Sequence, residues 1–88
     1  MSENAESYKQ CCVEGVENAV AACQRHLDRV SKIHQMILAD ETLLDGDKAE
    51  RQSFLRLSRK CVAGAKKEHA RMETELERVK ALPLREFE

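Results

Sequence analysis

The sequence predicts an all-α fold, a single antiparallel hairpin of two long helices that pack together in the manner of a coiled coil. Charged residues make up 35% of the 88 residues and aromatic residues only 3%, with one Pro and three Gly. This composition is typical of long amphipathic helices. The signals of a sheet, alternating β-branched runs joined by an Asn-Gly turn, are missing. The chain length allows one domain, residues 1–88.

The second observation is a repeat of seven residues in each half of the chain. Mostly apolar residues recur there with alternating spacings of three and four, which is the spacing of the a and d positions of a coiled coil. Each row predicts one stripe of a helix, called the seam below, that faces another helix. The seam positions are Val13, Val16, Val20, Cys23, Leu27, Val30, His34 and Ile37, followed by Leu55, Ser58, Val62, Ala65, His69, Met72, Leu76 and Val79.

The third observation is a turn signal between the two rows. Gly46 suits the left-handed residue that follows a helix, and Asp47 with Glu50 resembles the capping pair that begins one. Pro83 ends the second helix. The predicted segments are a first helix over about 4–44, a turn at 45–47, a second helix over about 48–82 and a loose tail over 83–88.

The seam and the turn also agree in register. If the two rows face each other, the residue numbers of every pair add up to 92, which places the centre of the turn at residue 46, the glycine. The pairing sets large Leu27 against small Ala65, and it lets the polar His34 face Ser58. This agreement between independent signals favours a hairpin over two parallel helices from different chains.

One edge of the hairpin carries a second apolar stripe beside the seam. We expect this edge to bind a helical partner, either a second copy that completes a four-helix bundle or a different helical protein. The alternative is that residues such as Ile33 and Phe54 only thicken the hairpin's own core. The predicted partner-binding residues are Cys12, Ala19, Ile33, Phe54, Leu57, Cys61 and Leu82.

Two other functions are open from the sequence. Cys23, His26 and His69 could converge as zinc ligands in a small metal- or redox-responsive protein. A buried thiol and hydrogen-bonded core histidines explain the same residues, so no metal or cofactor is expected. The basic stretch 51–71 raises nucleic-acid binding, but a solvated face explains it as well.

Chemistry and membrane association are not expected. The sequence has no glycine-rich phosphate loop, no nucleophile elbow and no carboxylate pair with a reason to be buried, so we predict neither an enzyme nor a small-molecule substrate. The net charge is −1, and no apolar run approaches the ~18 residues of a membrane span. The amino-terminal residues resemble no targeting signal, so a cytoplasmic protein is expected.

Gly46-Asp47, Phe54 and the stretch 58–65 behind them resemble the small E-type co-chaperones of needle subunits in bacterial type III secretion. The resemblance covers about the central third of the chain, which departs from it in a longer second helix and four cysteines. It implies a helical hairpin that pairs with a larger tetratricopeptide-like chaperone and keeps a needle protein from polymerising early. The expected function is therefore a non-enzymatic interaction module, such as an assembly factor or co-chaperone.

Overall fold

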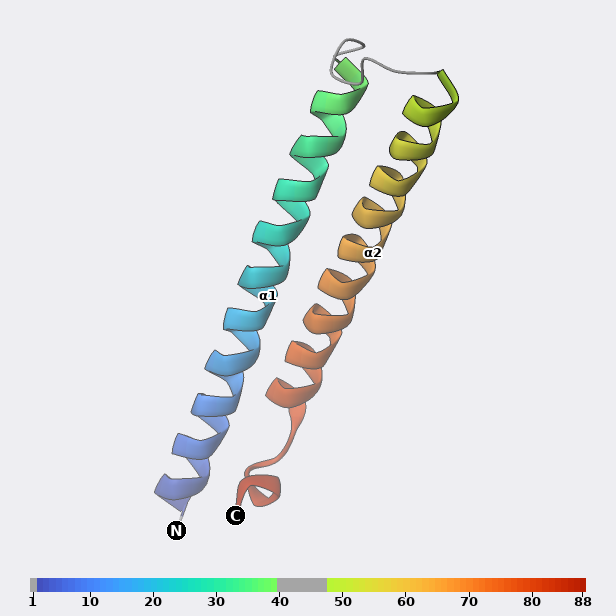
Figure 1. Ribbon diagram of the computed structural model, residues 1–88. Helices are drawn as coiled ribbons and strands as arrows, with labels where there is room; N and C mark the ends of the chain where they lie inside the picture. Colours follow the sequence, from blue (N-terminus) through green and yellow to red (C-terminus); the bar gives the residue numbers. More distant parts are fainter. Residues whose placement is uncertain (1, 40–47) are drawn as a thin grey trace.

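The computed structural model describes residues 2–39 and 48–88, which form a hairpin of two antiparallel helices (Figure 1). Helix α1 spans Ser2–Ala39 and helix α2 spans Lys48–Ala81, followed by the short 3₁₀ helix η1, Leu84–Phe87. The molecule is a rod of 65 × 14 × 12 Å with both termini at one end. The predicted all-α hairpin is confirmed. The predicted turn at 45–47 and the last part of the predicted first helix lie outside the described residues.

The seam forms the interface between the two helices. All sixteen seam positions are buried or half-buried. The best-covered seam residues lie towards both ends of the rod and near its middle: Val13, Ile37, Leu55, Ala65 and Val79, each no more than 9% exposed. A hydrogen bond of 2.8 Å joins His34 Nδ1 and Ser58 Oγ, the polar pair that the register predicts. The register is therefore confirmed at the level of side-chain atoms.

Each helix supplies a cation to the carboxyl end of the other. The last carbonyl groups of a helix lack partners within it and carry partial negative charge. Arg51, in the first turn of α2, donates a hydrogen bond of 3.4 Å to the Ile37 carbonyl of α1. Lys9, in α1, donates one of 2.8 Å to the carbonyl of Leu82, the residue that follows α2. The two ends of the hairpin are thus fastened reciprocally.

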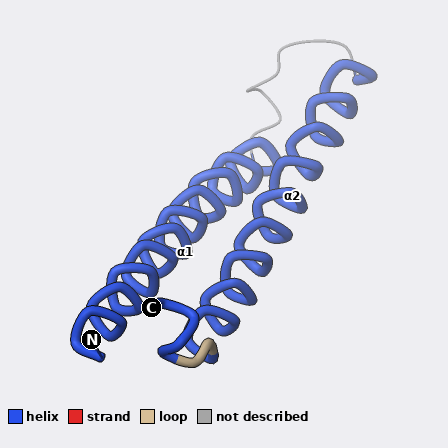
Figure 2. Tube along the Cα trace, turned by 90° about the horizontal axis from the view of Figure 1, so that it is seen from below, coloured by secondary structure: helices blue, strands red, loops and turns tan. Residues whose placement is uncertain are grey.

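The carboxyl-terminal residues fold back on α1, whereas the sequence predicts a loose tail over 83–88. After Pro83 the backbone closes the turn of η1, with a 3.0 Å bond from Glu86 N to the Pro83 carbonyl. Figure 2 shows η1 beside the first turns of α1. Phe87 lines a small hollow there with Tyr8, and Ala5 is only 1% exposed. The tail is ordered because its apolar side chains find an apolar surface on α1.

Replacing Lys9 by Ala should release this end of the hairpin. We expect faster amide hydrogen exchange at residues 82–87 and a loss of about 1 kcal/mol in the free energy of unfolding, because a half-buried carbonyl loses a charged donor. Lys32→Ala is the matched control, since Lys32 is an exposed lysine of the same helix. Equal exchange at residues 82–87 in both variants would contradict the role given to Lys9.

Candidate partner-binding surface

Large apolar side chains are exposed at one end of the rod. Five of the six exposed large apolar residues within the described chain belong to the last turns of α1 or the first turns of α2, and they are 44–59% exposed: Ile33, Met36, Leu38, Phe54 and Leu57. Such side chains are ordinary on a surface when scattered, but a cluster marks a contact surface. The cluster therefore defines the candidate site.

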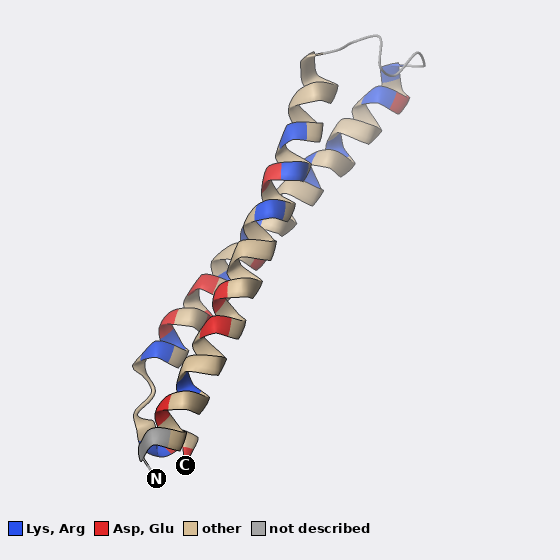
Figure 3. Cartoon of the chain, turned by 90° about the vertical axis from the view of Figure 1, so that its left-hand side faces the viewer, with Lys and Arg blue, Asp and Glu red and all other residues tan. Residues whose placement is uncertain are grey.

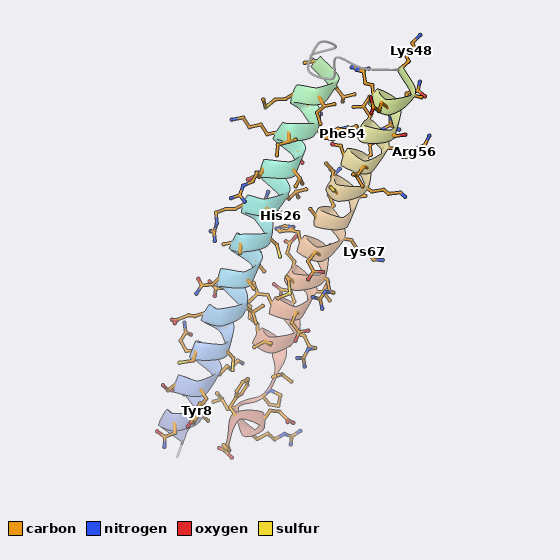
Figure 4. All side chains as sticks on the ribbon, viewed as in Figure 1. Tyr8, His26, Lys48, Phe54, Arg56 and Lys67 are labelled. Atoms are coloured by element: carbon orange, nitrogen blue, oxygen red, sulfur yellow. The ribbon has the colours of Figure 1, made fainter. Side chains whose placement is uncertain are left out.

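Part of this cluster lines a shallow groove between the two helices, called the apolar groove below. Its volume is about 190 Å³, and it is lined by Val30, Ile33, Ile37, Phe54, Leu57, Ser58 and Cys61. Figure 4 labels Phe54 near the start of α2. Phe54 is 46% exposed and Leu57 is 59% exposed, so both side chains present apolar surface to solvent as well as to the groove.

The apolar groove unites four of the seven predicted partner-binding residues, namely Ile33, Phe54, Leu57 and Cys61. The other three lie in the half of the rod that holds the termini and do not line the groove. Cys12 is exposed there, whereas Ala19 and Leu82 are half-buried. Cys12 precedes Ile33 by 21 residues, or about 32 Å of helix. The predicted edge is thus divided into a groove at one end and a separate surface at the other.

Several residues of this surface were not among the predicted ones. Val30, Ile37 and Ser58 line the groove although they belong to the seam, because a two-helix seam is open along its edges. Met36 and Tyr8 are 52% and 64% exposed. The sequence held a signal for both, since they fall on the helix face next to that of Ile33 and Cys12.

The other edge of the hairpin is polar. A hollow there is lined by Ser31, His34, Gln35, Arg59 and Lys66, together with Val62 and Ala63. Figure 3 shows Lys and Arg gathered in the half of the rod formed by the end of α1 and the start of α2. No aromatic side chain lines this hollow, so it lacks the stacking surface that single-stranded nucleic acids use.

The proposed zinc ligands do not come together. His69 Nδ1 lies 3.0 Å from Glu73 Oε1, one turn along the same helix, while His26 is exposed. Across residues 2–39 and 48–88, no three His, Cys, Asp or Glu side chains are placed to share a metal ion. The four cysteines form no disulfide within the chain. The metal-responsive alternative therefore has no ligand set in this part of the chain.

Two ion pairs lie on the face of α2 that also bears Leu57 and Cys61, where Glu68 pairs with Arg71 and Glu75 with Arg78. Hydrogen bonds from these arginines lower the pKa of both carboxyl groups and raise the pKa of the arginines. A lowered carboxyl pKa means that the stabilisation is present above the usual range of glutamate and is lost as the pH falls through the lowered value. Both pairs join side chains three residues apart that are largely open to solvent, so each gives the helix a small stabilisation.

Comparison with protein-family models, with curated proteins and with solved structures found no match to this chain. The hairpin expected from the resemblance to needle co-chaperones is present, and the comparisons identify no family. Neither α1 nor α2 is long and apolar enough to cross a membrane.

Proposed function

We propose that the chain is a non-enzymatic interaction module that binds a helix in the apolar groove. The groove carries the proposal because it is a preformed apolar surface between two helices, where a helical partner can place its own apolar side chains. Ile33, Phe54 and Leu57 are its exposed apolar residues. The basic half of the rod around the groove suits a partner helix whose apolar residues are flanked by acidic ones.

The exposed area of the isolated hairpin supports association. A compact monomer of 10.0 kDa exposes about 5,200 Å², whereas this chain exposes 6796 Å². The difference exceeds the about 800 Å² that one protein buries in an interface of ordinary size. Among the described residues only six apolar ones are buried, and two of them are alanines. A third and a fourth helix would supply the burial that two helices lack.

A narrower form of this function follows from the sequence resemblance. As an assembly factor or co-chaperone of a type III secretion-like system, the hairpin would hold a helical segment of its client until assembly. The hairpin architecture and the exposed apolar residues are what support this form. A module of this kind acts by occupying a surface, and it requires neither a catalytic residue nor a cofactor.

Charged substitutions in the groove test the proposal. We expect Ile33→Asp and Phe54→Asp to abolish association, because each would bring a carboxylate into an apolar contact, while helix content changes little. Leu38→Asp is the matched control, since Leu38 is 44% exposed but does not line the groove. Each variant is measured by light scattering for self-association and by affinity capture from the source cell for other partners, with circular dichroism for helix content.

The proposal is supported if the groove variants lose a complex that the wild type and Leu38→Asp both form. It is contradicted if all three variants keep the same complexes. It is equally contradicted if the wild type is a monomer by scattering and captures no protein, because the groove would then have no occupant of either kind.

A further inference from the structure

We infer that the apolar groove is covered by a second copy of this chain, placed antiparallel to the first so that the two hairpins form a four-helix bundle. This inference rests on the proposed function and adds the identity and orientation of the partner. It depends on three features of the hairpin: an uneven distribution of charge, a strip of small residues on one face, and the register between its helices.

The charge is divided along the rod. Residues 25–67 contain ten Lys and Arg against six Asp and Glu, whereas the remaining residues contain five against ten. Figure 3 shows most of the Lys and Arg residues in one half of the rod and most of the acidic residues in the other. Two copies side by side in the same direction would place like charges together. In an antiparallel pair, the basic half of each copy lies against the acidic half of the other copy. The interface is then complementary to itself in charge.

The face of the hairpin that bears Ile33, called the contact face below, is also complementary in shape, because it carries large side chains in the basic half and small ones in the acidic half. On α1, the face that bears Ile33 continues into the acidic half as a strip of small uncharged residues, called the small-residue strip below: Cys12, Gly15, Ala19 and Ala22. Gly15, and Gly64 on α2, have open space where a Cβ would stand, so the hairpin alone requires neither glycine. A glycine inside a helix costs about 1 kcal/mol relative to alanine. Close approach of a helix from the second copy explains both glycines.

The register fixes which residues meet. When two hairpins stack face to face about a two-fold axis across the rod, α1 lies on α1 and α2 lies on α2, each antiparallel. With the axis beside Ala22, Ile33 faces Cys12 of the second copy and Met36 faces its Tyr8. Within one hairpin, residues that face each other have numbers that add up to 92, so residue 70 of α2 lies opposite Ala22 and also stands at the axis. Leu57 then faces Leu82 of the second copy. Glu68 faces Arg71 of the second copy.

This arrangement covers four of the six large apolar side chains that are exposed in the described part of the chain. Ile33 enters the small-residue strip, and Met36, Leu57 and Tyr8, all more than 50% exposed, gain apolar neighbours. Glu68 and Arg71, which pair within one chain, gain a second partner of opposite charge across the axis. The strip ends where η1 covers Ala5, which sets the limit of the contact at the end with the termini.

The first measurement is the mass in solution with a substitution on the contact face. Sedimentation equilibrium of the full chain should give twice the mass of 10.0 kDa. Ala22→Glu sets two carboxylates against each other at the axis and should weaken the dimer by about a hundredfold or more. Ala21→Glu is the control, since Ala21 is equally an exposed alanine but points away from the contact face. It should leave the dimer unchanged.

The second measurement is the orientation. Ser53 is exposed on the outer side of α2, and Ser53→p-azidophenylalanine accepts a nitroxide while the native cysteines stay in place. Residue 53 is 17 residues from the axis, so at 1.5 Å per residue the two nitroxides of an antiparallel dimer should be about 50 Å apart in a pulsed electron resonance experiment. A parallel dimer would place them about 20 Å apart.

The antiparallel dimer should also weaken in about 1 M salt, which screens charges beyond about 3 Å.

A dimer with the long distance and the expected difference between Ala22→Glu and Ala21→Glu supports the inference. A monomer, a short distance or an unaffected Ala22→Glu dimer overturns it. A monomer that still captures another protein through the apolar groove would overturn only this inference and leave the proposed function standing.

Discussion

Replacing Ile37 by Ala should reduce the free energy of unfolding by about 2–4 kcal/mol, which is a large share of the stability of so small a domain. Ile37 is 2% exposed, lies opposite Leu55 in the seam and also forms part of the floor of the apolar groove. The truncation leaves a void that neighbouring residues of a two-helix core cannot close. Thermal melting followed by circular dichroism should show a midpoint lower by about 4–8 °C for each kcal/mol.

Leu38→Ala provides the control for this prediction. Leu38 is the neighbour of Ile37 in sequence, loses a side chain of similar size, is 44% exposed and does not line the apolar groove. Its truncation should change the unfolding midpoint by a small fraction of the Ile37 effect. Equal midpoints for the two variants would mean that the seam is not the source of stability.

Ala65→Leu should be the second large effect, with a loss of about 1–3 kcal/mol. Ala65 is 6% exposed and lies opposite Leu27, so a second large side chain has no room between the helices. Leucine is a strong helix former, so the loss comes from overpacking and not from helix propensity. Chemical denaturation of the single variant measures the cost directly.

The exchange of the two residues tests the pairing itself. Leu27→Ala combined with Ala65→Leu restores one large and one small side chain at the same level of the seam, so the double variant should recover most of the stability lost in either single variant. A double-mutant cycle then gives a favourable coupling energy. Simple addition of the two losses would mean that residues 27 and 65 do not meet.

The seam and its register could be predicted from the sequence because both follow from local rules. A spacing of three and four fixes the helix face that is buried, and the polar pair His34 and Ser58 lies where the register places it. The order of the carboxyl terminus could not be predicted in the same way. It depends on Phe87 reaching the surface around Ala5, a contact between residues more than eighty positions apart.

The candidate site was predictable only in part, for a related reason. The two columns of residues that contain Ile33 on α1, and Phe54 and Cys61 on α2, lie along the edge where the groove is found, but a column does not show where that edge is hollow. The groove depends on how far Val30 and Ile37 remain uncovered between the helices, and this follows from three-dimensional packing. Cys12 and Leu82 belong to the same columns and yet lie outside the groove.

The reciprocal hydrogen bonds of Arg51 and Lys9 have a consequence for sliding of the helices. A seven-residue repeat permits a shift of one heptad, about 10 Å, after which apolar residues again face apolar residues. Such a shift would carry Arg51 away from the Ile37 carbonyl and Lys9 away from the Leu82 carbonyl at once, since the two bonds are at opposite ends of the rod. The hairpin is therefore pinned at both ends against misalignment, which the repeat alone would tolerate.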